Sequence, residues 1–320
     1  MNPEASLYVA VMDILVLGGT SFVGRGIVEC LLERGHRPAL FNRGRTGTDL
    51  FPEVERLVGD RDSGDYAALA GRSWDAVVDV TGYVPRHVAE AAAALDHRVG
   101  RYVFLSTGLV YDRSAASRVI TEASPRLPPW RGSEIVDDDT YGPLKVACED
   151  DLLARFGHRA SFVRPGWVAG PHDRSGGFTY WVRRGARGGR MAVPERLDQP
   201  MQVIDVRDLA CLVVLLIEKD LPGAYNAVGP WPAVTLGELI GACGDADLTP
   251  VARDFDWPLL LPDASWDIMF QMSPSAAYAA GMPRTPLART VADTLAWDRA
   301  RGEPSLVWGI TEEQEAELLR

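Results

Sequence analysis

The sequence predicts an α/β fold in which a doubly wound parallel sheet carries a smaller C-terminal substrate-binding cap. Two observations lead to this prediction. In the first half of the chain, short β-branched runs alternate with helical stretches, which is typical of βαβ units and a parallel sheet. A glycine-rich segment also follows the first of these runs directly, where such folds turn from a strand into a helix.

Six strands and three intervening helices are expected in this first half. The first helix ends at Gly35, and the second begins at Pro85, since proline is tolerated in the first turn of a helix. The expected strands are residues 13–17, 38–42, 56–58, 76–80, 101–106 and 160–164, and the expected helices are residues 22–34, 85–94 and 141–156.

The pattern loosens after residue 164. Residues 166–200 are rich in glycine, arginine and aromatic residues, and we expect loops around a helix at residues 178–187. A strand at 201–206 and an apolar helix at 207–219 follow. We therefore predict a dinucleotide-binding domain at residues 12–165 and mainly a substrate-binding cap at residues 166–320, with residues 201–219 returning to the first sheet.

The composition narrows the classes of function. The 320 residues include 33 Lys+Arg and 44 Asp+Glu, a formal charge of −11. This balance disfavours a general nucleic-acid or anionic-membrane surface, because phosphates are bound by clustered Lys and Arg. No apolar run reaches the roughly 20 residues that span a bilayer, and the first residues make a poor signal peptide. We expect a cytoplasmic protein.

Cysteine and histidine spacing gives no indication of a metal site. The four cysteines are far apart in the sequence, and no Cys-x-x-Cys motif or histidine pair with metal-ligand spacing is present. Scattered thiols in a chain of this length are typical of core residues rather than of a disulfide framework. No metal is therefore predicted.

The glycine-rich segment at residues 18–24 predicts a dinucleotide site. Glycines at a strand-to-helix turn allow a tight bend, and the helix N-terminus then offers N–H groups to a pyrophosphate. The spacing is that of a GxxGxxG variant, with a serine at the middle position. The predicted cofactor-binding residues of this segment are Gly18, Thr20, Ser21, Phe22, Val23 and Gly24.

The end of the second strand indicates which dinucleotide is bound. NAD-binding chains usually place an acid there for the ribose hydroxyls, whereas this chain has Asn42, Arg43 and Arg45. Two guanidinium groups at this corner can pair with a 2′-phosphate, so NADP (NADPH) is the preferred cofactor and NAD is the alternative. After the third strand, Asp60 and Arg61 are expected to flank the adenine.

A tyrosine and a lysine stand four residues apart in the helix expected at 141–156. Tyr141 and Lys145 share one face of that helix. A free tyrosine, with a pKa of about 10, is a poor acid or base near neutrality, and a nearby ammonium favours its phenolate. The pair is thus a candidate general acid/base, placed between the fifth and sixth strands.

Four segments together resemble the extended or atypical short-chain dehydrogenase/reductases, the NAD-dependent epimerase/dehydratase group. They are Gly-Gly-Thr-Ser-Phe-Val-Gly at residues 18–24, Asp-Val-Thr-Gly at 79–82, Phe-Leu-Ser-Thr-Gly-Leu-Val-Tyr at 104–111, and Tyr-Gly-Pro-Leu-Lys at 141–145. The resemblance runs from about residue 13 through residues 205–210 and more weakly to residue 297. It implies a Rossmann-type NAD(P)-binding fold but does not specify one reaction.

The resemblance also implies roles for individual residues. Tyr141 would be the catalytic acid/base, and Lys145 would bind the nicotinamide ribose and lower the tyrosine pKa. Thr107 would hydrogen-bond the substrate oxygen, with Ser106 as the fallback. Further cofactor contacts would come from Thr81, Gly82, Pro165 and Val168.

Departures from the family pattern bear on the substrate. Gly108 and Leu109 follow Thr107 where sugar-nucleotide dehydratases carry acids, and Trp167 and Met201 occupy positions that usually serve a diphosphate. A sugar nucleotide is therefore disfavoured. Aromatic loop residues can build an apolar pocket, and the candidate substrate-binding residues are Tyr83, Tyr111, Trp167 and Trp181. The run Arg183, Arg184 and Arg187 is expected to be a solvated helix face.

Three functions remain open. The first is an NADP-dependent oxidoreductase that reduces the carbonyl of a small or medium non-nucleotide substrate, such as a secondary-metabolite intermediate, with tyrosine as the general acid. The second is an epimerase that acts by transient oxidation with retained cofactor. The third is a non-catalytic dinucleotide-sensing or RNA-binding relative, which the charge of −11 disfavours. A homodimer is expected by resemblance.

Overall fold

The computed structural model describes residues 10–115, 118–252 and 255–320. The chain divides into two compact units. The first comprises Met1–Leu105, Pro129–Phe162 and Val213–Gly223, and the second comprises Ser106–Pro128, Val163–Leu212 and Ala224–Arg320. The chain therefore crosses between the units several times. The segment after the fifth strand belongs with the C-terminal half, and the end of the helix expected at 207–219 belongs with the sheet.

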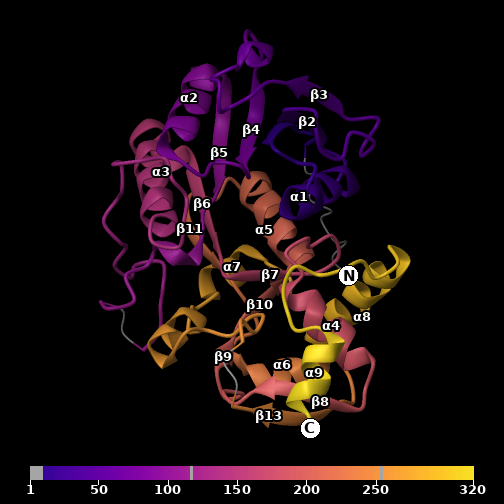
Figure 1. Ribbon diagram of the computed structural model, residues 1–320. Coiled ribbons are helices and arrows are strands. Elements are labelled where there is room, and N and C mark those ends of the chain that lie inside the picture. The colour runs from indigo at the N-terminus through magenta and orange to yellow at the C-terminus, as the bar shows by residue number, and fades with distance from the viewer. Residues whose placement is uncertain (1–9, 116–117, 253–254) are drawn as a thin grey trace, which may run out of the picture. The chain divides into compact units, whose positions relative to one another are not determined.

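The chain forms a seven-stranded sheet in the order β3-β2-β1-β4-β5-β6-β11, of which β1 to β5 belong to the first unit (Figure 1). The pairings β1/β2, β1/β4, β2/β3 and β4/β5 are all parallel. This order, with β1 in the middle, confirms the doubly wound α/β fold. The strands are β1 (Asp13–Leu17), β2 (Arg37–Asn42), β3 (Glu55–Val58), β4 (Trp74–Asp79), β5 (Val99–Leu105), β6 (Ala160–Pro165) and β11 (Gly223–Ala227).

Three helices accompany these strands: α1 (Phe22–Glu33), α2 (Pro85–Leu95) and α3 (Tyr141–Phe156). Figure 1 shows α2 and α3 side by side on one side of the strands and α1 on the other. The central strands β1 and β4 are largely buried, and Ile14 to Leu17 and Ala76 to Val78 have no exposed surface. Continuous apolar strands of this kind are expected where helices cover both faces of a parallel sheet.

The six strands and three helices expected in the first half are all present, with bounds that differ by a few residues at most. The seventh strand, β11, was not predicted. Its sequence Gly-Ala-Tyr-Asn-Ala has little β-branched character. The expected strand at 201–206 is interrupted at Gln202 and forms two short strands, β9 (Pro200–Met201) and β10 (Val203–Asp205), followed by α5 (Val206–Glu218).

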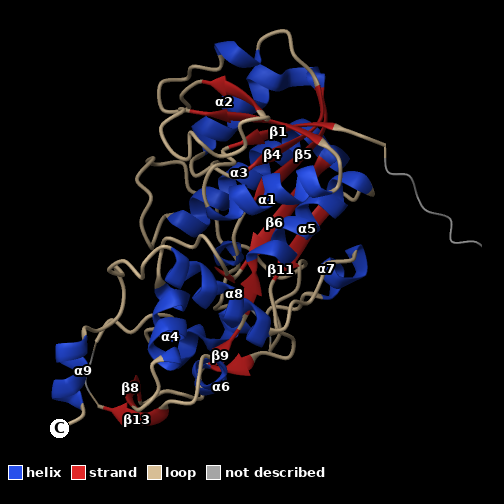
Figure 2. Cartoon of the chain, turned by 90° about the vertical axis from the view of Figure 1, so that its right-hand side faces the viewer, coloured by secondary structure: helices blue, strands red, loops and turns tan. Residues whose placement is uncertain are grey.

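The second unit combines helices with two-stranded sheets. Parallel pairs join β7 (Trp167–Ala169) to β10 and β8 (Arg190–Pro194) to β13 (Asp247–Val251), and β9 pairs antiparallel with β12 (Val234–Thr235). The helices are α4 (Gly177–Ala186), α6 (Leu236–Ala242), α7 (Ser275–Ala280), α8 (Leu287–Ala300) and α9 (Glu312–Leu318), drawn in blue in Figure 2. Trp181 and Trp257 stack in the apolar core of this unit, with ring centroids 5.9 Å apart.

Of the three arginines expected on a solvated helix face, Arg187 is exposed, whereas Arg183 and Arg184 are paired with acids of the C-terminal helices. Arg183 makes a bidentate ion pair with Asp298 of α8, at 2.7 and 2.9 Å. Arg184 is buried and donates from Nε to both carboxylate oxygens of Glu315 in α9, at 2.7 Å each. The guanidinium groups therefore attach the C-terminal helices to α4. The sequence expectation failed for these two because the acids that pair with them lie more than a hundred residues away.

In the part of the chain that is described, no helix combines the length and apolar character needed to cross a membrane. The same residues contain no group of three or more potential metal ligands.

Candidate functional site

The glycine-rich turn between β1 and α1 depends on the absence of side chains at three positions. Gly18 and Gly19 have φ values of +115° and +92°, which L-residues with side chains rarely adopt. A Cβ on Gly19 would lie 2.7 Å from Leu40 Cδ2, and one on Gly24 would lie 2.8 Å from the Gly19 nitrogen. The turn thus brings the start of α1 against the end of β1 as closely as the backbone allows.

The N-terminus of α1 has the features of an anion site. Ser21 is exposed, occupies the N-cap position in an extended conformation, and makes no capping hydrogen bond with its side chain among the described residues. The first turn, which begins at Phe22 and Val23, carries no acidic residue. The first N–H groups of a helix lack intrahelical partners, so this end can bind a phosphate. Thr20, half-buried, precedes it.

The corner after β2 is fixed by Asn42. Its side-chain amide donates to the Gly18 carbonyl at 3.1 Å, and its Oδ1 accepts from the Gly44 N–H at 2.9 Å. Asn42 therefore braces the glycine-rich turn against the β2 corner. Arg43 and Arg45 are exposed beyond it, and Arg43 approaches Asp62 at 3.3 Å in a solvent-accessible pair. Such exposed pairs contribute little and rearrange readily.

Arg61, which the sequence placed beside the adenine, is instead buried in an ion pair. Its Nη1 and Nη2 donate to the two carboxylate oxygens of Asp79 at 2.6 and 2.9 Å. It also donates to Thr81 Oγ1 at 3.0 Å and to the His87 carbonyl at 2.9 Å. The guanidinium thus joins the ends of β3 and β4 and the start of α2. Asp60, half-buried, accepts from the Asp62 N–H at 3.0 Å.

The turn after β4 lies against the glycine-rich turn. A Cβ on Gly18 would lie 3.0 Å from Thr81 Cγ2, and Thr81 Oγ1 donates to the Leu17 carbonyl at 3.3 Å. The next residue, Gly82, leaves no room for a side chain, because a Cβ there would lie 2.7 Å from both Phe104 and Val88. The ends of β1 and β4 are therefore in contact, as a cofactor that spans them requires.

Tyr141 and Lys145 lie on α3, which begins at Tyr141. Tyr141 is half-buried, and its N–H donates to the Asp137 carbonyl at 2.9 Å. Lys145, one turn later, is only 2% exposed, and its Nζ donates to the carbonyls of Gly82 at 2.8 Å and Leu105 at 2.5 Å. The lysine therefore connects α3 to the carboxyl ends of β4 and β5.

The environment of Lys145 perturbs its ionisation. Burial lowers the pKa of Lys145 to about 8, against opposing contributions from the nearby Cys148 thiol, Asp79 and Glu149. Its Nζ also lies 4.1 Å from the centroid of the Phe104 ring, a contact that favours the cation. A lysine with a pKa this close to neutrality is typical of a functional site.

Other predicted residues lie in the second unit. Thr107 is 7% exposed, and its Oγ1 accepts from the Leu109 N–H at 3.2 Å, capping a short 3-10 helix. The Ser106 hydroxyl is buried and has no hydrogen-bond partner among the described residues. Pro165 ends β6, and Val168 pairs with Ile204 where β7 meets β10. Both are half-buried.

The four candidate substrate residues separate into two groups. Trp181 has no exposed surface and donates from its indole nitrogen to the Pro258 carbonyl at 2.8 Å, so it is a core residue and does not fit the predicted role. Tyr111 is 1% exposed and its hydroxyl donates to Asn226 Oδ1 at 2.7 Å, which also places it in the interior. Tyr83 is 48% exposed, and Trp167 is half-buried against Phe270.

Sequence reasoning missed Asp79 and Tyr102. Asp79 has no exposed surface, and the Tyr102 hydroxyl donates to its Oδ2 at 2.7 Å. Burial alone would raise the pKa of Asp79, but the Arg61 guanidinium and these hydrogen bonds hold it below its usual value. An acid directly after the buried apolar run Ala76 to Val78 was the signal in the sequence that could have identified Asp79.

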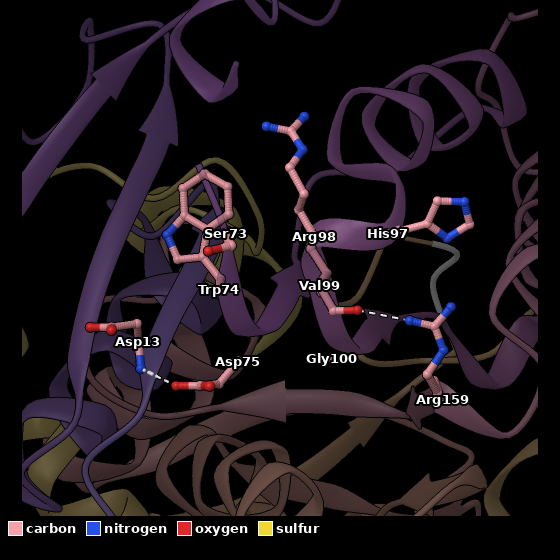
Figure 3. Close-up of a pocket in the computed structure, with 9 residues that line it drawn as sticks. All are labelled: Asp13, Ser73, Trp74, Asp75, His97, Arg98, Val99, Gly100 and Arg159. Atoms are coloured by element: carbon pink, nitrogen blue, oxygen red, sulfur yellow. Dashed lines mark hydrogen bonds between the residues drawn. The ribbon is translucent and has the colours of Figure 1, made fainter. Parts of the chain in front are cut away.

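A polar pocket of about 490 Å³ lies at the amino ends of β1, β4 and β5 (Figure 3). Its polar groups are already used by the fold: Asp75 accepts from the Asp13 N–H, and Arg159 donates to the Val99 carbonyl, both at 2.8 Å. Ligands of open α/β sheets bind at the carboxyl ends of the strands, where the glycine-rich turn and Lys145 lie. The pocket is therefore not the cofactor site.

Comparison with known proteins agrees with this geometry. The sequence model of the NAD dependent epimerase/dehydratase family matches residues 14–227. The match covers more than half of the chain, so the chain belongs to this family. The residues present fit a dinucleotide, because the turn at Gly18, Gly19 and Gly24 leaves space that a side chain would fill and the α1 N-terminus adjoins it.

Two curated relatives differ in their stated functions. The chain is 27% identical over 265 residues to a chloroplast stem-loop binding protein of 41 kDa from Arabidopsis thaliana, covering 77% of this chain and 66% of the relative. It is 36% identical over 181 residues to a 3-beta-hydroxysteroid dehydrogenase from Mycolicibacterium neoaurum, covering 51% of this chain and 49% of the relative. The chain thus spans 49% and 66% of the lengths of these relatives.

Solved structures share the fold at low sequence identity. The enzyme WbmH of Bordetella bronchiseptica, solved with NAD+, superposes with a TM-score of 0.68 at 23% identity, covering 91% of this chain and all of that chain. A dTDP-glucose 4,6-dehydratase from Bacillus anthracis, solved with NAD, has a TM-score of 0.68 at 15% identity, covering 92% and 98%. These likenesses concern the fold alone.

Proposed function

We propose that this protein is an NADP-preferring reductase that acts on the carbonyl group of a small or medium apolar substrate. The observation that carries the proposal is Lys145, which is buried one helical turn after Tyr141 and donates to two strand-end carbonyls beside the glycine-rich turn. An ammonium is costly to bury, so a structural role alone explains it poorly. Its position matches a lysine that serves a bound ribose and a neighbouring phenol.

In this proposal Tyr141 is the general acid. When bound, the nicotinamide of the cofactor supplies the hydride. The Tyr141 hydroxyl donates its proton to the oxygen of the carbonyl as negative charge develops there, and the Lys145 ammonium stabilises the resulting phenolate. Thr107 is the second hydrogen-bond donor to that oxygen, as the family resemblance implies.

The preference for NADP rests on the corner after β2. Asn42 stands where an acid would bind the ribose hydroxyls, and both of its polar groups are occupied by backbone partners. Arg43 and Arg45 are exposed just beyond it. Displacing the weak Arg43–Asp62 contact leaves a guanidinium for a 2′-phosphate at little cost.

The apolar substrate class rests on exposed side chains of the first unit. The loop that leads to α3 exposes Trp130 to 45%, Ile135 to 66% and Val136 to 45%, and Tyr83 is 48% exposed. The hydroxyl of Thr140, directly before Tyr141, donates to the Ile135 carbonyl at 2.7 Å, so this loop is held at the start of α3. Apolar surface near the proposed acid favours an apolar carbonyl compound over a charged one.

The alternative is an epimerase that oxidises and re-reduces one centre. The match to the epimerase/dehydratase family favours it as much as it favours a reductase. The two differ in the fate of the cofactor. A reductase releases its oxidised cofactor after each turnover, whereas an epimerase retains it. Release and turnover with added NADPH support the reductase, and cofactor retained through purification supports the epimerase.

The relative named for stem-loop binding raises a third function of another class. The chain keeps Thr107, Tyr141 and Lys145, which a binding protein without turnover does not need, and its charge of −11 opposes binding to a polyanion. An RNA-binding assay at several salt concentrations tests this alternative, because phosphate contacts give an affinity that falls steeply with salt.

The decisive experiment compares the wild type with Tyr141→Phe. NADPH oxidation is followed with a panel of apolar ketones, and cofactor binding is measured in parallel by fluorescence. We expect Tyr141→Phe to abolish turnover while the dissociation constant for NADPH changes less than about threefold, because one hydroxyl is lost at the substrate end of the site. An active Tyr141→Phe enzyme would refute the mechanism. A rise in the melting temperature of the protein with sugar nucleotides, and not with apolar ketones, would favour the epimerase.

A further inference from the structure

The buried ion pair between Arg61 and Asp79 is not explained by the proposed catalytic groups. The Arg61 side chain is 10% exposed and the Asp79 side chain is fully buried, so both charges are removed from water at considerable cost. Asp79 receives four hydrogen bonds: two from Arg61, one from the Tyr102 hydroxyl at 2.7 Å, and one from the Thr81 N–H at 3.1 Å. A carboxylate with this many donors is held in one orientation.

This carboxylate lies next to the residue that accepts from Lys145. A Cβ on Gly82 would lie only 3.1 Å from Asp79 Oδ2, so the Gly82 backbone packs directly on the carboxylate. The Gly82 carbonyl in turn accepts from Lys145 Nζ at 2.8 Å. Asp79, Gly82 and Lys145 thus form a continuous chain of contacts from the end of β4 to α3.

We propose that Asp79, braced by Arg61 and Tyr102, is a positioning residue that keeps Lys145 protonated and oriented through the Gly82 turn. Its value to catalysis rests on the proposed function, but its effect on Lys145 does not. The two charges of the pair act on Lys145 in opposite directions. The Asp79 carboxylate raises the pKa of Lys145, and the Arg61 guanidinium lowers it.

The other charged or titratable groups around Lys145 lie on several elements. On α3 itself, Cys148 is buried and burial raises the pKa of its thiol to about 12, and Glu149 is 1% exposed. After β4, the Tyr83 ring centroid lies 5.7 Å from Nζ. Partial burial and the charge of Asp79 raise the pKa of Tyr83, so this phenol is neutral near pH 8. Changes at Asp79 and Arg61 leave these groups in place.

The chain is well suited to a direct test, because it contains only two lysines, Lys145 and Lys219. Protein labelled with ¹³C at the lysine Cε gives two NMR signals, and Lys219, which is exposed, serves as the internal reference. Titration of the full chain then reports the pKa of Lys145 without any assumption about substrate. The variants are Asp79→Asn, Arg61→Gln, their combination, and Tyr102→Phe.

We expect Asp79→Asn to lower the Lys145 pKa by about 1 pH unit or more, since an opposite charge is lost and Arg61 remains. Arg61→Gln should raise it, and the double variant should give an intermediate value. Tyr102→Phe, which removes a hydrogen bond and no charge, should change it little. Opposite shifts from the two single variants are not expected of damage to packing, which would act in one direction.

An unchanged Lys145 pKa in Asp79→Asn, or shifts of the same sign in both single variants, would overturn the proposal. If Asp79→Asn does not fold, the Lys145 pKa in Arg61→Gln and in the double variant, which removes both charges, still shows whether the Asp79 charge raises that pKa. Turnover is a separate readout: in Asp79→Asn the loss of kcat at alkaline pH should begin at a lower pH, in parallel with the Lys145 pKa. A shifted pKa without this change would leave the positioning effect intact and contradict the proposed function of Lys145.

Discussion

The contact between Gly24 and Gly19 gives a sharp test of the cofactor site. In Gly24→Ala the new Cβ would lie 2.8 Å from the Gly19 nitrogen and 3.0 Å from its Cα. An ordinary contact needs at least about 3.4 Å, so α1 must move away from the turn by roughly 0.6 Å. Neither neighbour is a flexible side chain that can rotate out of the way. Overpacking of this kind costs about 1–3 kcal/mol.

The same movement displaces the N–H groups at the start of α1. Hydrogen bonds to a charged group contribute about 1.5–3 kcal/mol each, so misplacing one of them should weaken dinucleotide binding by about tenfold to a hundredfold. We expect Gly24→Ala to lower the free energy of unfolding in urea by about 1–3 kcal/mol and to raise the NADPH dissociation constant by at least tenfold.

Gly241→Ala is the matched control. Gly241 lies inside the helix α6, and a Cβ there meets no atom within 4 Å. In both variants the higher helix propensity of alanine adds about 0.5–1 kcal/mol to the free energy of unfolding, but only Gly24→Ala creates a clash. The control should therefore be slightly more stable than the wild type and should bind the cofactor normally. Equal stability and equal cofactor affinity in the two variants would refute the reasoning.

Three further predictions concern separate parts of the chain. Arg43→Ala should reduce a preference for NADPH over NADH by about tenfold, measured by fluorescence titration of both cofactors; an unchanged ratio would remove Arg43 from the 2′-phosphate site. Glu315→Gln should lower the free energy of unfolding by about 3–5 kcal/mol because Arg184 is left buried without its carboxylate, whereas Glu312→Gln, at an exposed pair, should cost less than about 1 kcal/mol. Lys145→Met should change the pH dependence of stability, because burial lowers the pKa of Lys145 in the folded state to about 8. Between pH 8 and 10.5 the unfolded wild type holds a proton that the folded wild type has lost, so the free energy of unfolding of the wild type rises by up to about 3 kcal/mol across this window. The free energy of unfolding of Lys145→Met should not rise in this way, so its difference from the wild type should change by that amount. Urea unfolding at several pH values measures this difference, and a constant difference would mean that Lys145 titrates normally in the fold.

The fold could be predicted because its signals are local. Continuous apolar strands, helix ends and the glycine-rich turn are each encoded within a few residues, and their order along the chain implies the parallel sheet. The strand β11 has no such signal. Its sequence, Gly-Ala-Tyr-Asn-Ala, becomes a strand through pairing at the sheet edge rather than through its own preference.

The site could be predicted only where a residue's role follows from its position in a motif. Lys145 lies in the helix α3 and the glycines lie in the turn between β1 and α1, because these local elements are encoded by neighbouring residues. The role of Arg61 depends on Asp79, which lies on another strand, and the role of Trp181 depends on Trp257 and the Pro258 carbonyl. An arginine or tryptophan in a loop-rich sequence carries no information about such a distant partner.

The choice of lysine at position 145 has its own physical reason. Of the 33 basic residues, 31 are arginine (33 minus the two lysines), so the chain uses guanidinium groups almost everywhere. At Lys145, carbonyl oxygens lie 2.8 and 2.5 Å from Nζ and the Phe104 ring centroid lies 4.1 Å away. A planar guanidinium is larger than an ammonium, and it cannot lose its proton as the site changes charge. An ammonium is compact, and its pKa can be adjusted by Asp79 and Arg61. The chain therefore has a lysine, rather than its usual arginine, at the position where the surrounding groups control the ionisation of the side chain.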